Sequence, residues 1–431
     1  MDTTKNKIKI EKILQEELEK NIKDIPGLKN QIDASVNKDV SFLLKNIMSG
    51  SVLLNFSDIH LEALEKGSVL RARIDGVLQE IFTFNVLQHK NLVSRIKLLS
   101  GLKLNINDKP QDGRFSVIFN QSGEIEIRAS TLPTEHGETI VMRILNPKNL
   151  ISLEDLGLRK DIYEIFIKEA QRPNGMIIVT GPTGSGKTTT LYAFLKKIRN
   201  PEIKVITIED PIEYHLDGIS QTQVNPNKGY TFAAGLRSIV RQDPDAILVG
   251  EIRDLETASI SLQAALTGHL VLSTIHANDA SGTISRFQAL GEVATNISPA
   301  INTAIAQRLI RKVCPLCAQM KKISIEELAI MQEELKNISN NVNVPPISKD
   351  TEIAEIQGCK HCNFTGYKGR VGIFEAMIFD DEIESFILTG PSASAIQKMA
   401  ISKGMTTMKQ DGLIKVLNGI TTMEEIKKVV G

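Results

Sequence analysis

The sequence has no net charge, no long apolar run and no amino-terminal secretion signal. Its 431 residues contain 51 Lys and Arg against 51 Asp and Glu, and this balance argues against a whole-protein electrostatic attraction to nucleic acid. No apolar run approaches the roughly 20 residues that a membrane-spanning helix needs. The residues before Lys7 lead into a charged stretch and lack the apolar core of a signal peptide. We therefore expect a cytoplasmic protein, which would reach a membrane only through a partner.

Cysteine and aromatic residues are also scarce. The chain has four cysteines, no tryptophan and only 4% aromatic residues. Disulfides are not expected without a secretion signal. The hydrophobic share of 42% and charged share of 24% are ordinary for a soluble globular protein. The length exceeds what one ordinary core can use, so we expect two or three domains.

A glycine-rich segment lies between the apolar run 176–180 and a predicted helix over 189–198. Strand, glycine-rich loop and helix in this order are the context of a phosphate-binding P-loop. The glycines let backbone N–H groups turn inward around a triphosphate, and the helix N-terminus adds partial positive charge. Lys187 would neutralise the β- and γ-phosphates of ATP, and the Thr188 hydroxyl would ligate Mg²⁺. The predicted nucleotide-binding residues are Gly181, Pro182, Thr183, Gly184, Ser185, Gly186, Lys187 and Thr188.

Short apolar strands alternate with helices after the P-loop. Strands are predicted over 205–208, 246–249 and 270–274, and helices over 232–241 and 257–266. This alternation predicts a parallel sheet covered on both faces. Acidic and polar residues follow the strand ends, where open α/β sheets bind their ligands.

These strand-end residues supply candidate catalytic groups. In a common P-loop arrangement, an aspartate that holds Mg²⁺ and a glutamate that activates water stand side by side, but here Gly250 precedes Glu251. Glu209 and Glu213, after another predicted strand, are the natural replacement. We predict Glu251 as the general base or water-positioning residue, and Glu209 and Glu213 in the Mg²⁺ and water shell. His276 would contact or sense the γ-phosphate, with a packed structural histidine as the alternative.

Two C-x-x-C pairs, Cys314 with Cys317 and Cys359 with Cys362, could chelate one tetrahedral Zn²⁺ through four thiolates. The pairs lie further apart than in simple zinc sites, and residues 323–335 between them are predicted as a helix. A cysteine-only site has no open coordination position, so we interpret it as structural. Redox cysteines and a nucleic-acid-binding zinc ribbon are the alternatives, and the scarcity of aromatic residues disfavours the ribbon.

The amino-terminal third has a different pattern. Up to about Lys29, apolar residues spaced by three and four predict one amphipathic helix, for packing or for docking a partner. A mixed α/β segment follows, with strands over 115–119 and 124–130 joined by a turn at 120–123. Arg128 and Arg143 stand on the polar face of alternating strands. Ordinary solvent-facing charge is one interpretation. The other is that an arginine from a neighbouring domain or subunit stabilises the transferring phosphoryl group.

From about Ser57 to Asp381 the chain resembles the secretion ATPases of type II secretion and type IV pilus assembly. Besides the P-loop, the matching segments correspond to the family's second N-terminal domain, its aspartate box, its Walker B motif with glycine before glutamate, its histidine box and the segment after the second cysteine pair. These segments are 57–62, 73–78, 111–114, 128–134, 207–214, 246–254, 273–279 and 366–375.

The resemblance implies an α/β fold in which a RecA-like P-loop ATPase domain has a parallel-rich twisted sheet. A smaller PAS-like α/β domain would precede it, and it would carry a zinc-binding C-terminal subdomain. The predicted divisions are an N-terminal helical segment 1–37, the N2-like domain 38–148, the ATPase domain 149–312, the tetracysteine zinc subdomain 313–372 and a C-terminal helical subdomain 373–431.

The resemblance also implies a homohexameric ring docked on an inner-membrane platform protein. It raises the expectation that Arg128 and Arg143 reach the nucleotide, and Arg237 and Arg370 match other arginines that line the site or interface. Only about 37 residues precede the N2-like domain, so partner or cyclic-dinucleotide contacts made through a larger N-terminal domain are in doubt. The retraction branch of the family generally lacks the cysteine pairs, so a role in pilus retraction is not expected.

We therefore expect an ATP-hydrolysing motor that assembles a type IV pilus or type II secretion pseudopilus, for protein export, adhesion or DNA uptake. A P-loop nucleic-acid translocase is the alternative, although no direct nucleic-acid contact is expected. A scaffold that binds nucleotide without hydrolysis is a third class, which the joint presence of Lys187, Thr188 and Glu251 disfavours.

Overall fold

The computed structural model describes residues 6–120 and 123–431, which form two compact units. One unit holds the chain up to Asn149 and the cysteine-bearing segments Cys314–Cys317 and Gln357–Lys368. The other unit, which we call the ATPase unit after the domain that the sequence predicts within it, holds Leu150–Val313, Ala318–Ile356 and Gly369–Gly431. Each is described by itself. Over the described residues, we find no helix with both the length and the apolarity to cross a membrane.

The amino-terminal unit is built on a seven-stranded sheet in the order β1-β5-β6-β7-β2-β3-β4. Neighbouring strands are antiparallel except β1 and β5, which are parallel. The predicted hairpin is confirmed as β5 and β6, although the turn residues Gln121 and Ser122 lie outside the described residues. The strands are β1 Lys7–Lys9, β2 Asp58–Leu64, β3 Gly67–Ile74, β4 Val77–Phe84, β5 Gln111–Phe119, β6 Gly123–Thr134 and β7 Gly137–Leu145, and the helices are α1 Lys12–Asn21, α2 Ile25–Asp33, α3 Val40–Leu53 and α4 Val86–Leu99.

The single amphipathic helix predicted up to Lys29 is wrong, because strand β1 and helices α1 and α2 occupy this stretch. Ile8 belongs to β1 and pairs with β5. Asp24 starts a new helix by accepting a hydrogen bond from the Gly27 N–H at 2.8 Å, and Pro26 occupies the first turn. Proline is tolerated only at a helix start, so Asp24 and Pro26 impose a break between two helices. The apolar spacing continues across this break and therefore suggests one helix.

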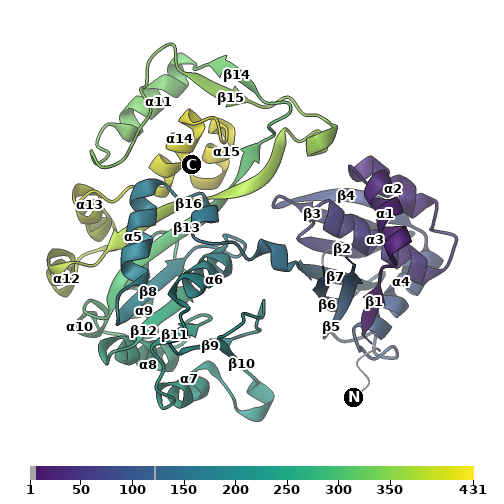
Figure 1. The fold of residues 1–431 in the computed structure, drawn as a ribbon, viewed down its shortest axis with the longest axis horizontal. Coiled ribbons are helices and arrows are strands. Elements are labelled where there is room, and N and C mark those ends of the chain that lie inside the picture. Colours follow the sequence, from purple (N-terminus) through teal and green to yellow (C-terminus); the bar gives the residue numbers. More distant parts are fainter. Residues whose placement is uncertain (1–5, 121–122) are drawn as a thin grey trace. The chain divides into compact units, whose positions relative to one another are not determined.

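The ATPase unit contains a second seven-stranded sheet, in the order β10-β9-β11-β12-β8-β13-β16 (Figure 1). From β10 to β13 every pair of neighbours is parallel. The predicted α/β fold with a parallel-rich ATPase sheet is therefore confirmed. The strands are β8 Gly175–Thr180, β9 Val205–Glu209, β10 Ser220–Gln223, β11 Ala246–Val249, β12 Leu270–Ile275, β13 Ile301–Val313 and β16 Tyr367–Ile378, with a separate pair β14 Gln319–Lys322 and β15 Glu352–Glu355.

Helices cover both faces of this sheet. In β8, Met176 and Ile178 belong to one apolar core, whereas Ile177 and Val179 belong to another. Alternate side chains of a strand point to opposite faces, so a wholly apolar strand such as β8 needs cover on both. The helices are α5 Lys160–Ala170, α6 Lys187–Ile198, α7 Phe232–Val240, α8 Leu255–Leu266, α9 Gly282–Leu290, α10 Ala294–Ile297, α11 Ile325–Leu335, α12 Asp381–Leu388, α13 Ala393–Ser402, α14 Met408–Leu417 and α15 Met423–Val430, with 3-10 turns at Glu154–Leu156 and Pro226–Lys228. Two further 3-10 turns, Pro147–Asn149 and Lys360–Cys362, belong to the amino-terminal unit.

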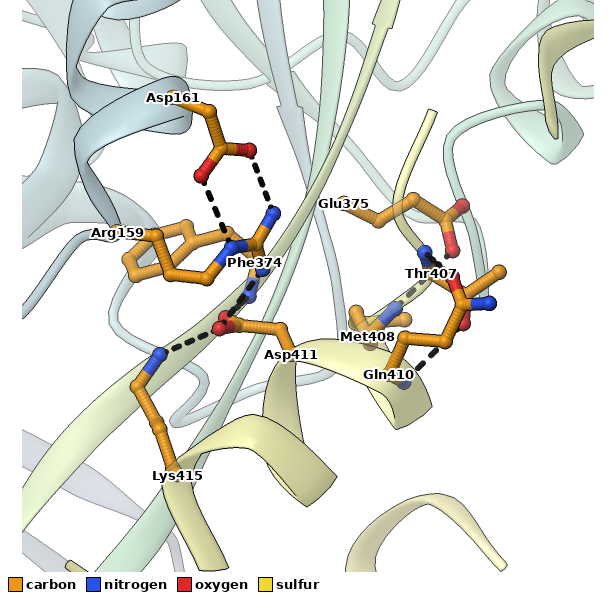
Figure 2. A network of polar contacts seen from close by, with 9 residues as sticks. All are labelled: Arg159, Asp161, Phe374, Glu375, Thr407, Met408, Gln410, Asp411 and Lys415. Carbon is orange, nitrogen blue, oxygen red and sulfur yellow. Dashed lines mark hydrogen bonds and ion pairs between the residues drawn. The ribbon is translucent and has the colours of Figure 1, made fainter. Parts of the chain in front are cut away.

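A buried ionic network ties helix α14 to the rest of the ATPase unit (Figure 2). Asp411 on α14 pairs with Arg159 at 2.9 Å and with Lys415 at 2.7 Å, and accepts the Phe374 N–H of β16 at 2.8 Å. Arg159, just before α5, also pairs with Asp161 at 2.7 Å. The network fixes the carboxy-terminal helices to the start of α5 and to the edge strand β16.

Candidate active site

The P-loop has the tight backbone that phosphate binding requires. Gly181, Gly184 and Gly186 have φ of +147°, +81° and +91°, where a side chain would be strained. A Cβ on Gly181 would lie 2.5 Å from the carbonyl oxygen of Gln307 on β13, and one on Gly186 would lie 2.7 Å from the Gln307 amide nitrogen. Gln307 therefore supports the loop from beneath, and only glycine fits against it.

The loop is suited to a nucleotide. Lys187, the first residue of α6, donates to the carbonyls of Gly181 at 2.8 Å and Pro182 at 3.1 Å, so its charge has only carbonyl partners there. Burial lowers its pKa. The Ser185 hydroxyl is buried without a hydrogen-bond partner among the described residues. Thr188 is exposed beside it. These donors fit a triphosphate, and the Thr188 hydroxyl fits a Mg²⁺ bound with it.

Hydroxyl groups join the strand ends next to the P-loop. Thr180, the last residue of β8, donates to the carbonyl of Ile275 at 2.8 Å and accepts the Ala277 N–H at 2.7 Å. Thr274 on β12 donates to the Gly250 carbonyl at 2.9 Å. Because these bonds run from β8 to β12 and from β12 to β11, they hold the residues after each strand in fixed positions.

Two predicted catalytic residues meet at this edge. The imidazole Nε2 of His276 lies 3.7 Å from one Glu251 carboxylate oxygen. The other carboxylate oxygen pairs with Arg253 at 2.5 Å. The structure therefore brings Glu251, after β11, together with His276, after β12. Arg253 was not predicted, although it follows Glu251 closely in sequence.

The geometry explains the glycine before Glu251. A Cβ on Gly250 would lie 3.3 Å from the Ile208 carbonyl and 3.4 Å from the Glu209 Cα. The Gly250 N–H also donates to the Ile208 carbonyl at 2.8 Å. The end of β9 thus packs closely against Gly250 and leaves little room for an aspartate.

Glu209 is directed into the protein. It is only 4% exposed, and it accepts hydrogen bonds from Thr207 at 2.6 Å, from Gln221 at 3.2 Å and from the Tyr192 hydroxyl. Burial raises the pKa of Glu209. Both its oxygens are engaged, and Glu213 lies half-buried on the following loop. The Mg²⁺ and water roles assigned to these acids stay predictions.

Arg128 and Arg143 occupy one row of the amino-terminal sheet. Across the strands, Arg114 pairs in register with Arg128, Arg128 with Arg143, Arg143 with Asp58, and Asp58 with Arg73. Only Asp58, which pairs with Arg143 at 3.0 Å, interrupts the positive charge within this row. The structure thus brings Arg128 and Arg143 side by side within their own unit.

The other predicted arginines have simpler surroundings. Arg237 on α7 pairs with Glu256 at the start of α8, and Arg370 is exposed on β16. The described contacts join neither to Glu251 or His276. Their roles at the site or at an interface stay predictions.

The four cysteines come together. Sγ atoms are 3.9 Å apart for Cys314 and Cys359, and 3.8 Å apart for Cys317 and Cys362. A tetrahedral zinc with Zn–S bonds of about 2.3 Å separates its sulfurs by about 3.8 Å. Burial opposes ionisation of Cys362, but backbone N–H groups, including that of Gly366, lower its pKa to about 7. In the part of the chain that the structure describes, this is the only group with metal-ligand geometry, and it fits zinc.

Sequence reasoning missed three residues around the P-loop. Tyr192 on α6 donates to Glu209, Gln307 supports the glycines, and Arg308 donates to the Asn278 carbonyl at 3.0 Å. Gln307 and Arg308 belong to β13, which is distant in sequence from the P-loop but paired with β8. Their only sequence signal is a pair of polar residues directly after the short apolar run 304–306.

A parallel sheet with a P-loop after its interior strand β8, and an acid and a histidine after the neighbouring strands β11 and β12, defines a P-loop nucleotide-hydrolysing enzyme. Residues 33–428 match the model of the family described as Type II/IV secretion system protein. The chain belongs to this family of secretion ATPases, and ATP hydrolysis is its activity.

Several relatives are similar over most of this chain. Type II secretion system protein E of Dickeya dadantii is 42% identical over 94% of this chain and 78% of its own length. The type IV pilus assembly ATPase PilB of Thermus thermophilus is 42% identical over 89% of this chain and 42% of its own length.

Solved structures agree in fold. The pilus retraction motor PilT with bound ADP has a TM-score of 0.60 and 26% identity, over 89% of this chain and 95% of that chain. The Legionella pneumophila ATPase DotB has a TM-score of 0.64 and 23% identity, over 89% of this chain and 94% of that chain, and supports the fold alone.

Proposed function

We propose that the chain is a cytoplasmic, homohexameric motor that hydrolyses ATP to assemble a type IV pilus or the pseudopilus of a type II secretion system. It would dock on the inner-membrane platform protein of that machine. The observation that carries the proposal is the strand-end site, where Lys187, Glu251 and His276 follow β8, β11 and β12. Relatives that share about 40% of its residues are named for these two machines.

The residues of the site divide the work of hydrolysis. The P-loop and Lys187 bind the phosphates, and Thr188 would hold Mg²⁺, which neutralises charge on the β- and γ-phosphates. Glu251 orients a water for attack and accepts its proton. His276, beside Glu251, contacts the γ-phosphate and reports its loss. Glu209 and Glu213 serve the Mg²⁺ and water shell, with Glu209 setting the position of the loop that carries Glu213.

Arginines from the amino-terminal unit complete the site in the proposed ring. Charge that develops on the transferring phosphoryl group is stabilised best by fixed positive groups. Arg128 and Arg143, adjacent in register on β6 and β7, would supply it to a nucleotide bound by another copy. Arg237 and Arg370 would line the site or the interface. Zinc on the four cysteines would have a structural role.

The experiment is steady-state ATPase activity across protein concentrations, with the size of the assemblies measured alongside, for wild type and Arg128→Ala. The expected result is wild-type activity per chain that rises with assembly, and a variant that assembles but stays slow. Activity that is independent of assembly and unaffected by the variant would contradict the ring motor. Duplex DNA is added in a parallel series, because stimulation by DNA would favour a nucleic-acid translocase instead.

A further inference from the structure

Two positive side chains lie at the P-loop, and their partners are carbonyl oxygens. Lys187 donates to Gly181 and Pro182. Arg308 donates from one nitrogen to Asn278 at 3.0 Å and from another to Gln307 at 3.2 Å. Within residues 6–120 and 123–431, neither cation forms an ion pair. Half-buried cations that the protein leaves without a carboxylate partner favour an anionic ligand.

Arg308 links the floor of the P-loop to the histidine-bearing loop. The Gln307 carbonyl that accepts from Arg308 is the same oxygen that lies 2.5 Å from where Gly181 would carry a Cβ. On its other side, Arg308 binds Asn278, which closely follows His276. The Arg308 guanidinium therefore joins Gln307, which supports the P-loop, to the loop that carries His276.

The electrostatics agree with this position. Burial lowers the pKa of Arg308, and the charges of Asp279 and Glu375 oppose that effect without forming an ion pair with it. Arg308 in turn depresses the pKa of Lys187. Two like charges that repel each other at one loop are stabilised together when an anion with several negative oxygens binds between them.

We propose that Arg308 is a catalytic residue of ATP hydrolysis, which binds the γ-phosphate of the nucleotide held by the P-loop of its own chain. The guanidinium can present two parallel N–H donors to phosphate oxygens, which a lysine cannot. Arg308 belongs to the ATPase unit, whereas Arg128 and Arg143 belong to the amino-terminal unit. The inference rests on nucleotide binding by this chain and not on the proposed ring.

The test compares Arg308→Ala with wild type and with Lys312→Ala, which removes an exposed cation further along β13. Affinities for a fluorescent non-hydrolysable ATP analogue and for fluorescent ADP are measured with Mg²⁺. Because a hydrogen bond between charged groups is strong, Arg308→Ala should weaken the ATP analogue about tenfold or more. It should weaken ADP about twofold at most, since ADP lacks the γ-phosphate, and lower kcat about 10²-fold. Lys312→Ala should leave all three unchanged.

Thermal unfolding without nucleotide establishes that Arg308→Ala is folded, and Arg308→Lys provides a second variant that keeps the charge but not the paired donors. The lysine variant should recover part of the preference for the ATP analogue over ADP. An unchanged preference in both variants, or equal weakening of both nucleotides, would overturn the proposal. Because binding is measured independently of turnover, a wild type that binds but does not hydrolyse ATP would count against the motor and not against Arg308.

Discussion

At the scale of single residues, Glu251 is the proposed general base of hydrolysis. We expect Glu251→Gln to bind ATP normally and to hydrolyse it about 10²-fold more slowly, because glutamine keeps the size of the side chain but cannot accept a proton. Pre-steady-state hydrolysis and nucleotide binding are measured on the same preparation. Glu164→Gln, which changes an exposed acid on α5, is the matched control. Near-normal turnover of Glu251→Gln would remove the assignment.

Lys187 gives the site a pH dependence with a definite sign. Burial lowers its pKa below the ordinary 10.5, Glu251 opposes this, and Arg308 adds to it. A bound triphosphate favours the charged lysine, so binding takes up a proton once the pH exceeds the pKa of the free protein. Affinity for the ATP analogue should then fall with rising pH, by up to about tenfold per unit. Arg308→Ala should move this fall to higher pH, and affinities independent of pH up to 10.5 would contradict the argument.

Glu209 illustrates what sequence could and could not predict at this scale. Its place at the end of a strand was predicted, and the structure confirms β9 as Val205–Glu209. The direction of its side chain was not predicted, although residues two apart share one face of a strand. The side chains of Glu209 and Thr207 therefore share one face of β9, and the Thr207 hydroxyl donates a hydrogen bond to Glu209 at 2.6 Å. Tyr192, the other partner, comes from α6 and could not be paired with Glu209 without the packing of α6 on the sheet.

At the scale of elements, the order of the ATPase strands and helices was predictable because each apolar strand ends at a polar or glycine residue. Helix α8 begins at Leu255, two residues before the prediction, because Asp254 caps it by accepting the Thr257 N–H at 2.8 Å. The long edge strand β16 was not predicted. It pairs with distant parts of the chain, and the sequence pattern carries no information on such partners.

The buried network on α14 should be a major source of stability in the ATPase unit. Asp411→Ala would leave Lys415 buried without its carboxylate and Arg159 paired with Asp161 alone, at a cost of about 3 kcal/mol or more in the free energy of unfolding. Asp350→Ala is the matched control, because Asp350 pairs with Lys322 in an exposed position and should contribute less than about 1 kcal/mol. Urea unfolding, followed by helix content, compares the two. Equal effects would show that burial of the network is not what matters.

The tetracysteine cluster should stabilise structure without taking part in hydrolysis. Removing zinc with a chelator should make the segments 314–317 and 357–368 exchange their amide hydrogens faster and become sensitive to protease. The reason is that the four cysteine sulfurs, paired at 3.8–3.9 Å, would have no cross-link between them without the metal. The intrinsic hydrolysis by protein that remains folded should change little. Metal analysis of the purified protein is the first control, and a preparation without zinc would contradict the structural site. Immediate loss of nucleotide binding on chelation would contradict a purely structural role of the cluster.

At the scale of the whole molecule, the balance of 51 basic and 51 acidic residues does not show how the charges are placed on each sheet. Arg114, Arg128, Arg143 and Arg73 share one row of a single sheet with only Asp58 among them. Net charge alone does not predict this row, and the neighbouring carboxylate of Glu126 lies within 3.9 Å of both Arg114 and Arg128. The alternation of the strands did predict Arg128 and Arg143 on a polar face, but the row depends on the register of five strands, which only the structure provides.

This row leads to the last prediction, that Arg128 acts on a nucleotide bound by another copy. Lys187→Ala cannot bind ATP but carries an intact arginine row, whereas Arg128→Ala has an intact P-loop and lacks the donor. Lys187→Ala alone should be inactive, and Arg128→Ala alone should be slow. If they are mixed and reassembled in equal amounts, about a quarter of the sites in a head-to-tail ring should combine an intact P-loop with an intact arginine from its neighbour. ATPase activity should therefore rise well above that of either variant.

The control mixes Lys187→Ala with Glu251→Gln. In this mixture no site can combine an intact P-loop with an intact Glu251, because both residues lie in one ATPase unit. Recovery in the first mixture alone requires action between copies, and recovery in neither would place Arg128 outside the reaction or within its own chain.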